Sequence, residues 1–407
     1  MRSLAEHRAT VLSLVEPLPA TAVPVGSALG LVLAADVVAA VDLPGFDNSA
    51  MDGYAVRADE LAGAGPSTPV VLPVAGDVAA GDTTRHVLDP GSVVRIMTGA
   101  PMPAGADAVV QVELTDGGAH RVSLHHAPQP GGSVRRRGED VRTGEHVLPR
   151  GTRLGPGHLG LAAAVNAAEV LVHPRPRVTV ISTGDELVAP GSAIEHGRIV
   201  DSNRVMLGAL VEAAGAEVAD SVHLRDDADE VRAYLDALPG EPDLVVTSGG
   251  VSMGVYDTVK EVLTADGGVE FAKVAMRPGM PQGCGRVGRS GTPVVTLPGN
   301  PVSSLVSFHV FVLPAIRRLA GLDPDADGAF EAVADAGWGA APGKTELTRV
   351  VETDGRVVPS GGQGSHVLGA LSAATALAVV PTDVDRVLPG DRLRCLPLLG
   401  QDRDRGL

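Results

Sequence analysis

Strand-like and helix-like segments alternate between residues 175 and 322 of the chain. The strand-like runs, rich in β-branched residues, are residues 177–181, 218–224, 244–246, 269–272 and 292–297. The helical patterns between them are residues 203–214, 227–235, 257–263 and 302–319. Such alternation is typical of a parallel sheet whose strands are connected by helices. It predicts an α/β domain over residues 175–322, with Ser202 or Asn203 capping the first helix and Asp226 or Asp227 the second.

The chain has 407 residues, enough for more than one domain. A stretch dense in Gly and Pro, with short β-rich runs, predicts a β domain over residues 43–138. Similar Ala- and Val-rich segments flank it, so we expect it to be inserted into an N-terminal domain made of residues 1–42 and 139–174. Residues 323–407 begin as a linker and continue as short strands with Gly-rich turns, which predicts a C-terminal β barrel. The predicted fold class is multidomain α/β.

The charge balance argues against a nucleic-acid partner. Asp and Glu number 49 against 33 Lys and Arg, which gives a net charge of −16. Such a chain repels nucleic-acid phosphates unless a local basic patch overrides the balance. The only tight basic run, Arg135-Arg136-Arg137, has no aromatic residues beside it to stack bases, so it suits a small anion better.

The cysteine content and the hydropathy pattern indicate a cytoplasmic protein. The two cysteines are too few for a disulfide framework and have no metal-ligand spacing, which is typical of a reducing compartment. The N-terminal segment has the pattern of an amphipathic helix and not that of a signal peptide. No uninterrupted apolar stretch approaches about 18 residues, so we expect no membrane association.

Three of the predicted strands end in unusual loops. In open α/β sheets ligands bind outside the carboxyl ends of the strands, where loops and helix N-termini supply N–H donors. Taken singly, each loop is as well explained as an ordinary glycine turn. None matches the patterns of a P-loop NTPase or a nicotinamide dehydrogenase. The residues that we expect to cradle an anion there are Ser182, Thr183, Gly184, Ser248, Gly249, Gly250, Ser252, Pro298, Gly299, Asn300 and Pro301.

Four carboxylates, those of Asp185, Glu186, Asp226 and Asp257, are expected at the same sheet edge. They would repel an anionic ligand unless a hard divalent cation bridges them, which favours Mg²⁺. For Asp226 and Asp257 a role as helix N-cap is an equally good interpretation. Lys273, which follows the strand-like run 269–272, is the best candidate for a charged phosphate contact, although it is equally ordinary as a surface lysine.

Seven motifs, taken together, resemble the molybdopterin molybdenumtransferase family, also called the MoeA family, which is related to the gephyrin E domain. The first and sixth are the most specific, and the resemblance covers essentially the whole chain. The motifs are FDNSAMDGYAVR at 46–57, RIMTGAP at 95–101, RRRGED at 135–140, STGDEL at 182–187, SGGVS at 248–252, LPGNPVS at 297–303 and GSH at 364–366.

The resemblance implies an elongated four-domain protomer that forms a homodimer. The implied reaction inserts molybdate into adenylylated molybdopterin, with Mg²⁺, and releases AMP and molybdenum cofactor. The implied catalytic residues are Asp52, Thr98, Asp140, Glu186 and Asp257, and the implied metal ligands are Glu186, Asp226 and Asp257. The implied substrate contacts, besides those of the strand-exit loops, are Arg135, Lys273, Arg277, Arg349 and Ser365. The molybdopterin adenylyltransferase is a further expected partner.

Two other functions stay open at this point. A non-catalytic molybdopterin-binding protein or scaffold of the same fold would have no reason to hold acidic residues around an anion site. A nucleotide hydrolase using the same sheet edge would release AMP without molybdate. Molybdate and tungstate share charge and shape, so the sequence does not choose between them.

Overall fold

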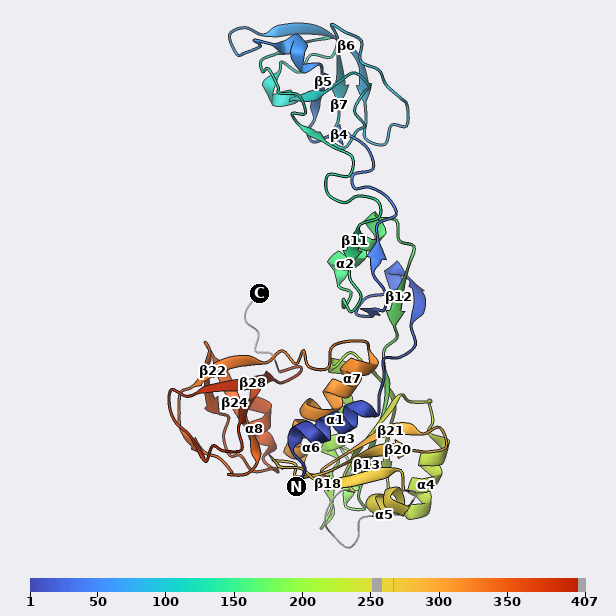
Figure 1. Ribbon diagram of the computed structural model, residues 1–407, viewed down its shortest axis with the longest axis vertical. Helices are drawn as coiled ribbons and strands as arrows, with labels where there is room; N and C mark the ends of the chain where they lie inside the picture. The colour runs from blue at the N-terminus through green and yellow to red at the C-terminus, as the bar shows by residue number, and fades with distance from the viewer. Residues whose placement is uncertain (251–257, 266, 402–407) are drawn as a thin grey trace. The chain divides into compact units, whose positions relative to one another are not determined.

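The structure is a computed structural model that describes residues 1–250, 258–265 and 267–401. The chain forms two compact units (Figure 1). Unit 1 contains residues 1–22, 30–34 and 171–407, and unit 2 contains residues 23–29 and 35–170. The finer division into four domains stays a prediction, and each unit is described by itself below.

A six-stranded sheet forms the centre of unit 1, with strand order β16-β13-β17-β21-β20-β18. The first four strands run parallel, as the alternating pattern predicts. The last two are antiparallel to their neighbours, which the sequence pattern did not indicate. The strands are β13 (Arg177–Thr183), β16 (Glu217–Leu224), β17 (Leu244–Ser248), β18 (Val269–Lys273), β20 (Pro281–Val287) and β21 (Thr292–Leu297).

Apolar helix faces cover this sheet. The helices are α1 (Leu4–Ser13), α3 (Ser202–Ala213), α4 (Ala228–Ala237), α5 (Thr258–Ala265) and a continuous helical run of α6 (Pro301–Ser307), the π-helical η4 (Phe308–Val312) and α7 (Leu313–Leu319). The run Pro301–Leu319 is long and apolar enough to span a membrane, but 83% of its most apolar window is buried, which is typical of a core helix. Phe308 and Phe311 are fully buried in the main core.

The cap residues differ in part from the expectation. Asp201 is the N-cap of α3, where its side chain accepts from the Arg204 N–H, so the predicted caps Ser202 and Asn203 lie inside the first turn. Asp227 is the N-cap of α4. Asp226 is therefore left for another role.

The predicted C-terminal β barrel is present in unit 1. Five strands pair in a closed ring, β24-β25-β22-β28-β26, and β26 pairs back to β24. The short strand β19 extends β24 on the outside of the ring. The elements are β19 (Met276–Arg277), β22 (Phe330–Ala334), β24 (Thr345–Thr353), β25 (Arg356–Pro359), α8 (Leu368–Ala373), β26 (Ala376–Val380) and β28 (Arg392–Pro397), with β23 (Trp338–Gly339) and β27 (Arg386–Val387) paired separately.

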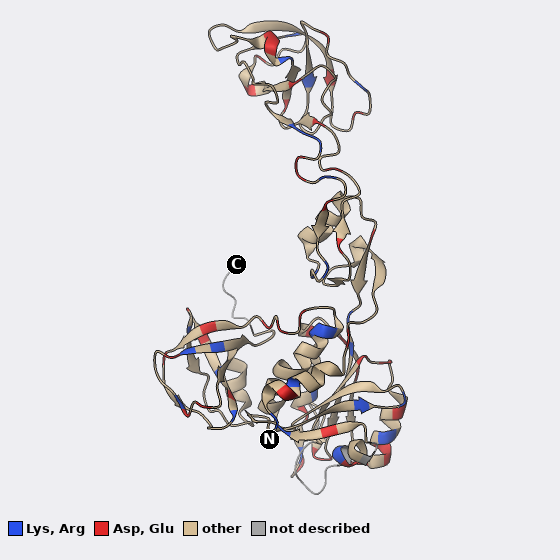
Figure 2. Ribbon diagram, viewed as in Figure 1, with Lys and Arg blue, Asp and Glu red and all other residues tan. Residues whose placement is uncertain are grey.

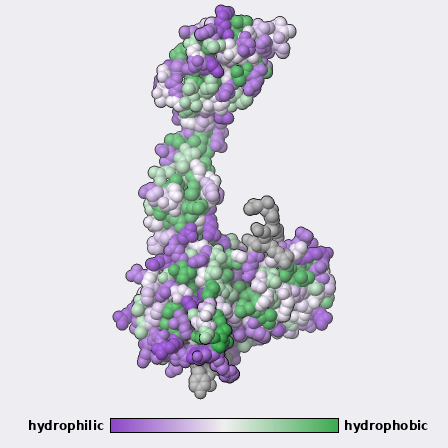
Figure 3. All heavy atoms as spheres, turned by 180° about the vertical axis from the view of Figure 1, so that it is seen from behind, coloured by the Kyte–Doolittle hydropathy of each residue, from purple (hydrophilic) through white to green (hydrophobic). Residues whose placement is uncertain are grey.

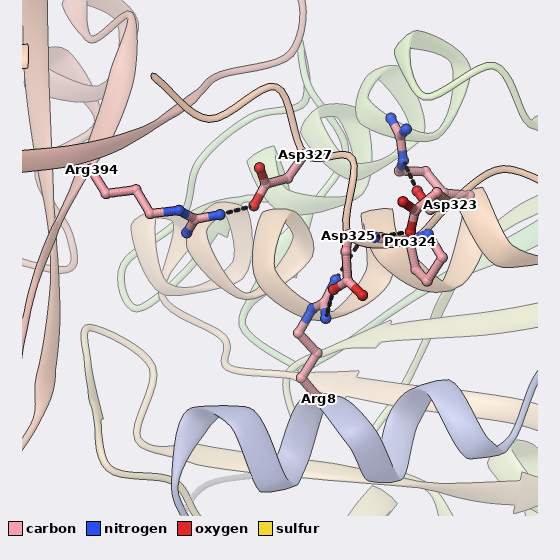
Figure 4. A network of polar contacts seen from close by, with 7 residues as sticks. Arg8, Asp323, Pro324, Asp325, Asp327 and Arg394 are labelled. Carbon is pink, nitrogen blue, oxygen red and sulfur yellow. Dashed lines mark hydrogen bonds and ion pairs between the residues drawn. The ribbon is translucent and has the colours of Figure 1, made fainter. Parts of the chain in front are cut away.

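A polar network ties the N-terminal helix to the linker that precedes the barrel (Figure 4). The Arg8 guanidinium on α1 lies 2.6 Å from an Asp325 carboxylate oxygen and donates to the Pro324 carbonyl at 2.7 Å. Arg394 on β28 pairs with Asp327 of the same linker. The acidic residues of the linker are thus matched with arginines.

Unit 2 contains a five-stranded sheet of order β8-β5-β7-β6-β9. Tyr54, Val56, Leu61 and Leu124 lie in its buried core. The strands are β5 (Gly53–Val56), β6 (Val70–Val78), β7 (Val93–Ile96), β8 (Ala108–Gln111) and β9 (Arg121–Leu124), with η2 (Ala58–Leu61) and η3 (Val112–Leu114) beside them. Two strand pairs and a helix complete the unit: β4 (Asn48–Ser49) with β10 (Val134–Arg135), β3 (Val37–Val38) with β11 (His146–Leu148), and α2 (Pro156–Ala164).

The remaining elements are short. They are β1 (Thr21–Pro24), η1 (Val25–Ser27), β2 (Val32–Leu33), β12 (Glu169–His173), β14 (Leu187–Val188) and β15 (Ile199–Val200). In the view of Figure 2, basic and acidic residues are interspersed on both units, and no broad basic face is visible.

Candidate functional site

The three unusual strand exits meet at one pocket of about 530 Å³ in unit 1. The strand order places β16 and β17 on opposite sides of β13, so the connections leave in opposite directions beside β13 and β17. Such a switch point opens a crevice at the carboxyl ends of the strands, where ligands of this architecture bind. The lining residues are Ser182, Thr183, Gly184, Glu186, Leu187, Ile199, Val200, Asp201, Ser202, Asn203, Asp226, Ser248, Gly249, Gly250, Gly299, Asn300, Pro301 and His366.

The loop after β13 requires glycine at position 184. Gly184 has φ +142°, and a Cβ built there would lie 2.5 Å from Glu186 Oε2. The Glu186 carboxylate therefore folds over Gly184 in space that any side chain would take. The Gly184 carbonyl is fixed by the His223 ring of β16, with 2.9 Å between the two atoms. These contacts present Glu186, which is exposed, to the pocket.

Two carboxylates of the predicted metal set, Glu186 and Asp226, line the same pocket. The Asp185 N–H donates to Asp226 Oδ2 at 3.3 Å, and the Asp226 N–H donates to Asp185 Oδ1 at 3.2 Å, so the loops after β13 and β16 are joined. Asp257 and Ser252 lie outside the described residues. Among the described residues, no three His, Cys, Asp or Glu side chains are arranged to hold a metal ion.

Both predicted serines at the strand ends are buried and bonded within the protein. Ser182 donates to the Asp201 carboxylate at 2.6 Å. Ser248 is 3% exposed and accepts from the Asn203 amide at 2.7 Å. Gly249 has φ +95°, and a Cβ there would lie 2.9 Å from the Thr183 carbonyl, so the first two exits touch through backbone.

In the third exit, Pro298 is buried outside the pocket lining, whereas Gly299 and Asn300 are exposed in it. Asn300 precedes α6, and its carbonyl accepts from the Ser304 N–H at 2.9 Å. Pro301 occupies the first helical position, where a missing N–H costs nothing.

The two predicted cations near β18 lie outside this lining. Lys273 is exposed at the end of β18, which runs in the direction of β21, so it lies at the same carboxyl edge of the sheet. Arg277 is on β19, and its guanidinium lies 3.6 Å from the Glu346 carboxylate of the barrel. The substrate roles of both stay predictions.

The barrel contributes one lining residue, His366, next to the predicted Ser365. The Ser365 carbonyl accepts from the Val302 N–H of α6 at 3.2 Å, which holds this loop against the pocket. Arg349 is 1% exposed, and its guanidinium donates to the carbonyls of Val367, Gly362 and Gly364. Burial lowers the Arg349 pKa. Arg349 therefore shapes the loop that carries His366, and a direct substrate contact stays a prediction.

Unit 2 holds the second set of predicted residues. Asp52 Oδ1 accepts from the Thr98 N–H at 2.6 Å and from the Thr98 hydroxyl at 2.8 Å. These bonds hold the Asp52 pKa below its ordinary value of 3.8. The exposed Asp140 donates its N–H to the Leu43 carbonyl at 3.0 Å.

The basic run in unit 2 is divided by its partners. Arg136 pairs with Asp47 and Arg137 with Asp42. Within the described part of the chain, the exposed Arg135 has no side-chain ion pair or hydrogen bond. Arg135 is thus the member of the run that is available for an anion, as the resemblance implies.

Sequence reasoning missed Asp201, Asn203 and His366 as pocket residues. Asp201 and Asn203 are the N-cap and the second helical residue of α3, and cap preference gave them only a structural reading. The signal that was present is their place at the start of the helix after the first strand exit, because that helix N-terminus faces the crevice. His366 belongs to the GSH motif, in which only Ser365 was selected.

Known proteins match the chain throughout its length. Three family profiles match in order: the MoeA N-terminal region (domains I and II) over residues 2–166, a probable molybdopterin binding domain over 179–318 and the MoeA C-terminal region (domain IV) over 331–398. A Mycobacterium tuberculosis protein named molybdopterin molybdenumtransferase 2 is 47% identical over 402 residues, covering 97% of this chain and 99% of the relative. The molybdopterin molybdenumtransferase of Haemophilus influenzae is 37% identical, covering 90% and 91%.

A solved structure shows the same fold. The molybdopterin biosynthesis MoeA protein of Pyrococcus horikoshii superposes with a TM-score of 0.84 at 30% identity, covering 98% of this chain and 99% of that one. The matches extend across both units and include every motif quoted above except where they fall between the matched regions. The chain belongs to the molybdopterin molybdenumtransferase (MoeA) family, a family of transferases of molybdenum cofactor biosynthesis.

Proposed function

We propose that this chain inserts molybdate into the dithiolene of adenylylated molybdopterin and releases AMP. The observation that carries the proposal is the pocket at the β13/β17 switch point, where three glycine-containing loops and the carboxylates of Glu186 and Asp226 face one cavity. Exposed backbone N–H groups suit phosphate oxygens. The cavity of about 530 Å³ is in the range of small-molecule sites.

A divalent cation, Mg²⁺, fits this donor set. Glu186 and Asp226 offer carboxylate oxygens, the ligands that Mg²⁺ prefers, and without a cation they would repel the phosphates of the substrate. Bound there, the ion would supply positive charge to the phosphate oxygens. Asp257 is proposed as a third ligand from the resemblance alone.

The residues of the chain would bind and orient the substrate. Lys273, at the carboxyl edge of the sheet, supplies positive charge for phosphate or molybdate, and in unit 2 the unpaired Arg135 does the same. Asp52 keeps its negative charge through the two bonds from Thr98, so it can accept hydrogen bonds from the ligand but cannot donate one.

The active form is proposed to be a cytoplasmic homodimer. Unit 2 exposes the large apolar residues Leu29, Val38 and Val41. Figure 3 shows apolar surface gathered on the part of unit 2 around α2. A second copy of the chain is the proposed cover for this surface. Transfer of adenylylated molybdopterin from the molybdopterin adenylyltransferase is the proposed source of substrate.

The deciding experiment is AMP release from adenylylated molybdopterin, with and without molybdate. Release that needs molybdate, together with formation of molybdenum cofactor, supports the transferase. Release that is equally fast without molybdate would identify a hydrolase, and the absence of release would identify a binding or scaffold protein. A parallel titration with tungstate measures the preference between the two oxyanions.

A further inference from the structure

Asn203, in the first turn of α3, bridges the exits of two neighbouring strands. Its Nδ2 donates to Ser248 Oγ at the end of β17 at 2.7 Å and to the Gly299 carbonyl after β21 at 2.6 Å. A backbone carbonyl only accepts, so the amide nitrogen must be the atom that faces Gly299. Asn203 Oδ1 is buried without a hydrogen-bond partner among the described residues. The amide therefore acts on the loops only through its donor atom.

The bonds beyond Ser248 have a fixed direction. Ser304 on α6 donates to the carbonyl of Pro298, which uses its only hydroxyl proton. At the Ser248–Ser304 contact, with 3.3 Å between the oxygens, Ser304 must then be the acceptor and Ser248 the donor. Protons point one way along this chain of bonds, from Asn203 through Ser248 and Ser304 to Pro298.

This direction decides what Ser248 can offer to a ligand. Its proton is directed to Ser304, which is fully buried, and one of its lone pairs accepts from Asn203. An ionised phosphate oxygen only accepts, so Ser248 cannot bind it without breaking the chain of bonds. Ser182 is committed in the same way, to Asp201.

We propose that Asn203 is a positioning residue of the pocket, which fixes the direction of the Asn203–Ser248–Ser304–Pro298 bonds and holds the exits of β17 and β21 in their binding geometry. Ser248 then supports the site and does not bind phosphate. The ligand used to test this, AMP, rests on the proposed function. The positioning itself rests only on the contacts above.

The test compares AMP affinity, by calorimetry in the presence of Mg²⁺, for Asn203→Asp and Ser248→Ala. Asn203→Asp places a carboxylate oxygen against the Gly299 carbonyl and turns the Ser248 hydroxyl away from Ser304. We expect AMP affinity to fall on the order of tenfold, as about 1.4 kcal/mol would give. Ser248→Ala keeps the Asn203–Gly299 bond, so its loss of affinity should be clearly smaller.

A control variant separates positioning from general destabilisation. Val211→Ala removes buried volume at the other end of α3, away from the pocket. It should lower the melting temperature and leave AMP affinity unchanged. The proposal is wrong if Val211→Ala and Asn203→Asp weaken AMP equally at equal losses of melting temperature, or if Ser248→Ala weakens AMP more than Asn203→Asp.

Hydrogen exchange without ligand tests the same proposal independently. In Asn203→Asp the backbone amides of the exits, at residues 248–250 and 299–301 where an N–H exists, should exchange faster than in the unmodified protein. Exchange that is unchanged there would overturn the positioning role. If the unmodified protein bound no AMP, the proposed function would fail, and the exchange result would still decide the role of Asn203.

Discussion

Gly184 shows how one residue sets the chemistry of the pocket. Its φ of +142° and the 2.5 Å approach of Glu186 Oε2 to a built Cβ leave room only for glycine. We expect Gly184→Ala to displace the Glu186 carboxylate and to reduce molybdate-dependent AMP release on the order of tenfold, a loss of about 1.4 kcal/mol. The matched control is Gly208→Ala in the interior of α3, where a Cβ has no neighbour within 4 Å. It should raise stability by about 0.5–1 kcal/mol and preserve activity, and equal activity in both variants would contradict this account of position 184.

Asp52 and Thr98 make a prediction about pH. The Thr98 bonds lower the Asp52 pKa in the folded state, so the stability that they contribute is present above the ordinary pKa of 3.8 and is lost as the pH falls through the lower folded value. Thr98→Val removes the hydroxyl donor, so the Asp52 pKa should rise. Carbon NMR of the Asp52 carboxyl group measures this directly, and the acid limb of the activity profile should move to higher pH. A carboxyl titration that does not move would show that Thr98 does not control this charge.

At the scale of elements, two adjacent acids at the start of α4 have separate roles. Asp227 caps the helix by accepting from the N–H groups of Asp229 and Glu230, whereas Asp226 lines the pocket and bonds to Asp185. We expect Asp227→Ala to lower the melting temperature by a few degrees with little effect on AMP release. Asp226→Asn should retain the melting temperature and require more Mg²⁺ for the same rate. The opposite pattern, in a Mg²⁺ titration run beside thermal melts, would exchange the two roles.

The antiparallel edge of the main sheet is a second lesson at this scale. Strand β20 contains two glycines, and a Cβ at Gly285 would lie 2.0 Å from the Gly268 carbonyl. Glycine is needed because the neighbouring strand β18 approaches closely. In the sequence the same glycines favour a turn, so the strand was not predicted.

At the scale of the whole molecule, the proposed dimer leads to a subunit-mixing prediction. Asp52→Asn and Glu186→Gln each disable one set of site residues, in unit 2 and unit 1 respectively. If the two sets that act together come from different subunits, a mixed dimer contains one intact site and one doubly altered site. Mixing the two inactive variants should restore part of the activity. The absence of rescue, after native mass spectrometry has verified subunit exchange, would count against a site shared by two chains.

The sequence by itself determined the family, the order of strands and helices in the α/β part and the C-terminal barrel, because local periodicity and dense motifs specify these. It also placed Glu186, Asp226 and the glycine loops at one sheet edge, because parallel strands all end on the same side. Tertiary structure alone decided which polar groups stay available to a ligand. Whether Ser182 and Ser248 keep a free proton, which of three arginines lacks a carboxylate, and whether Arg349 binds substrate or loop carbonyls depend on partners distant along the chain, which no local pattern specifies.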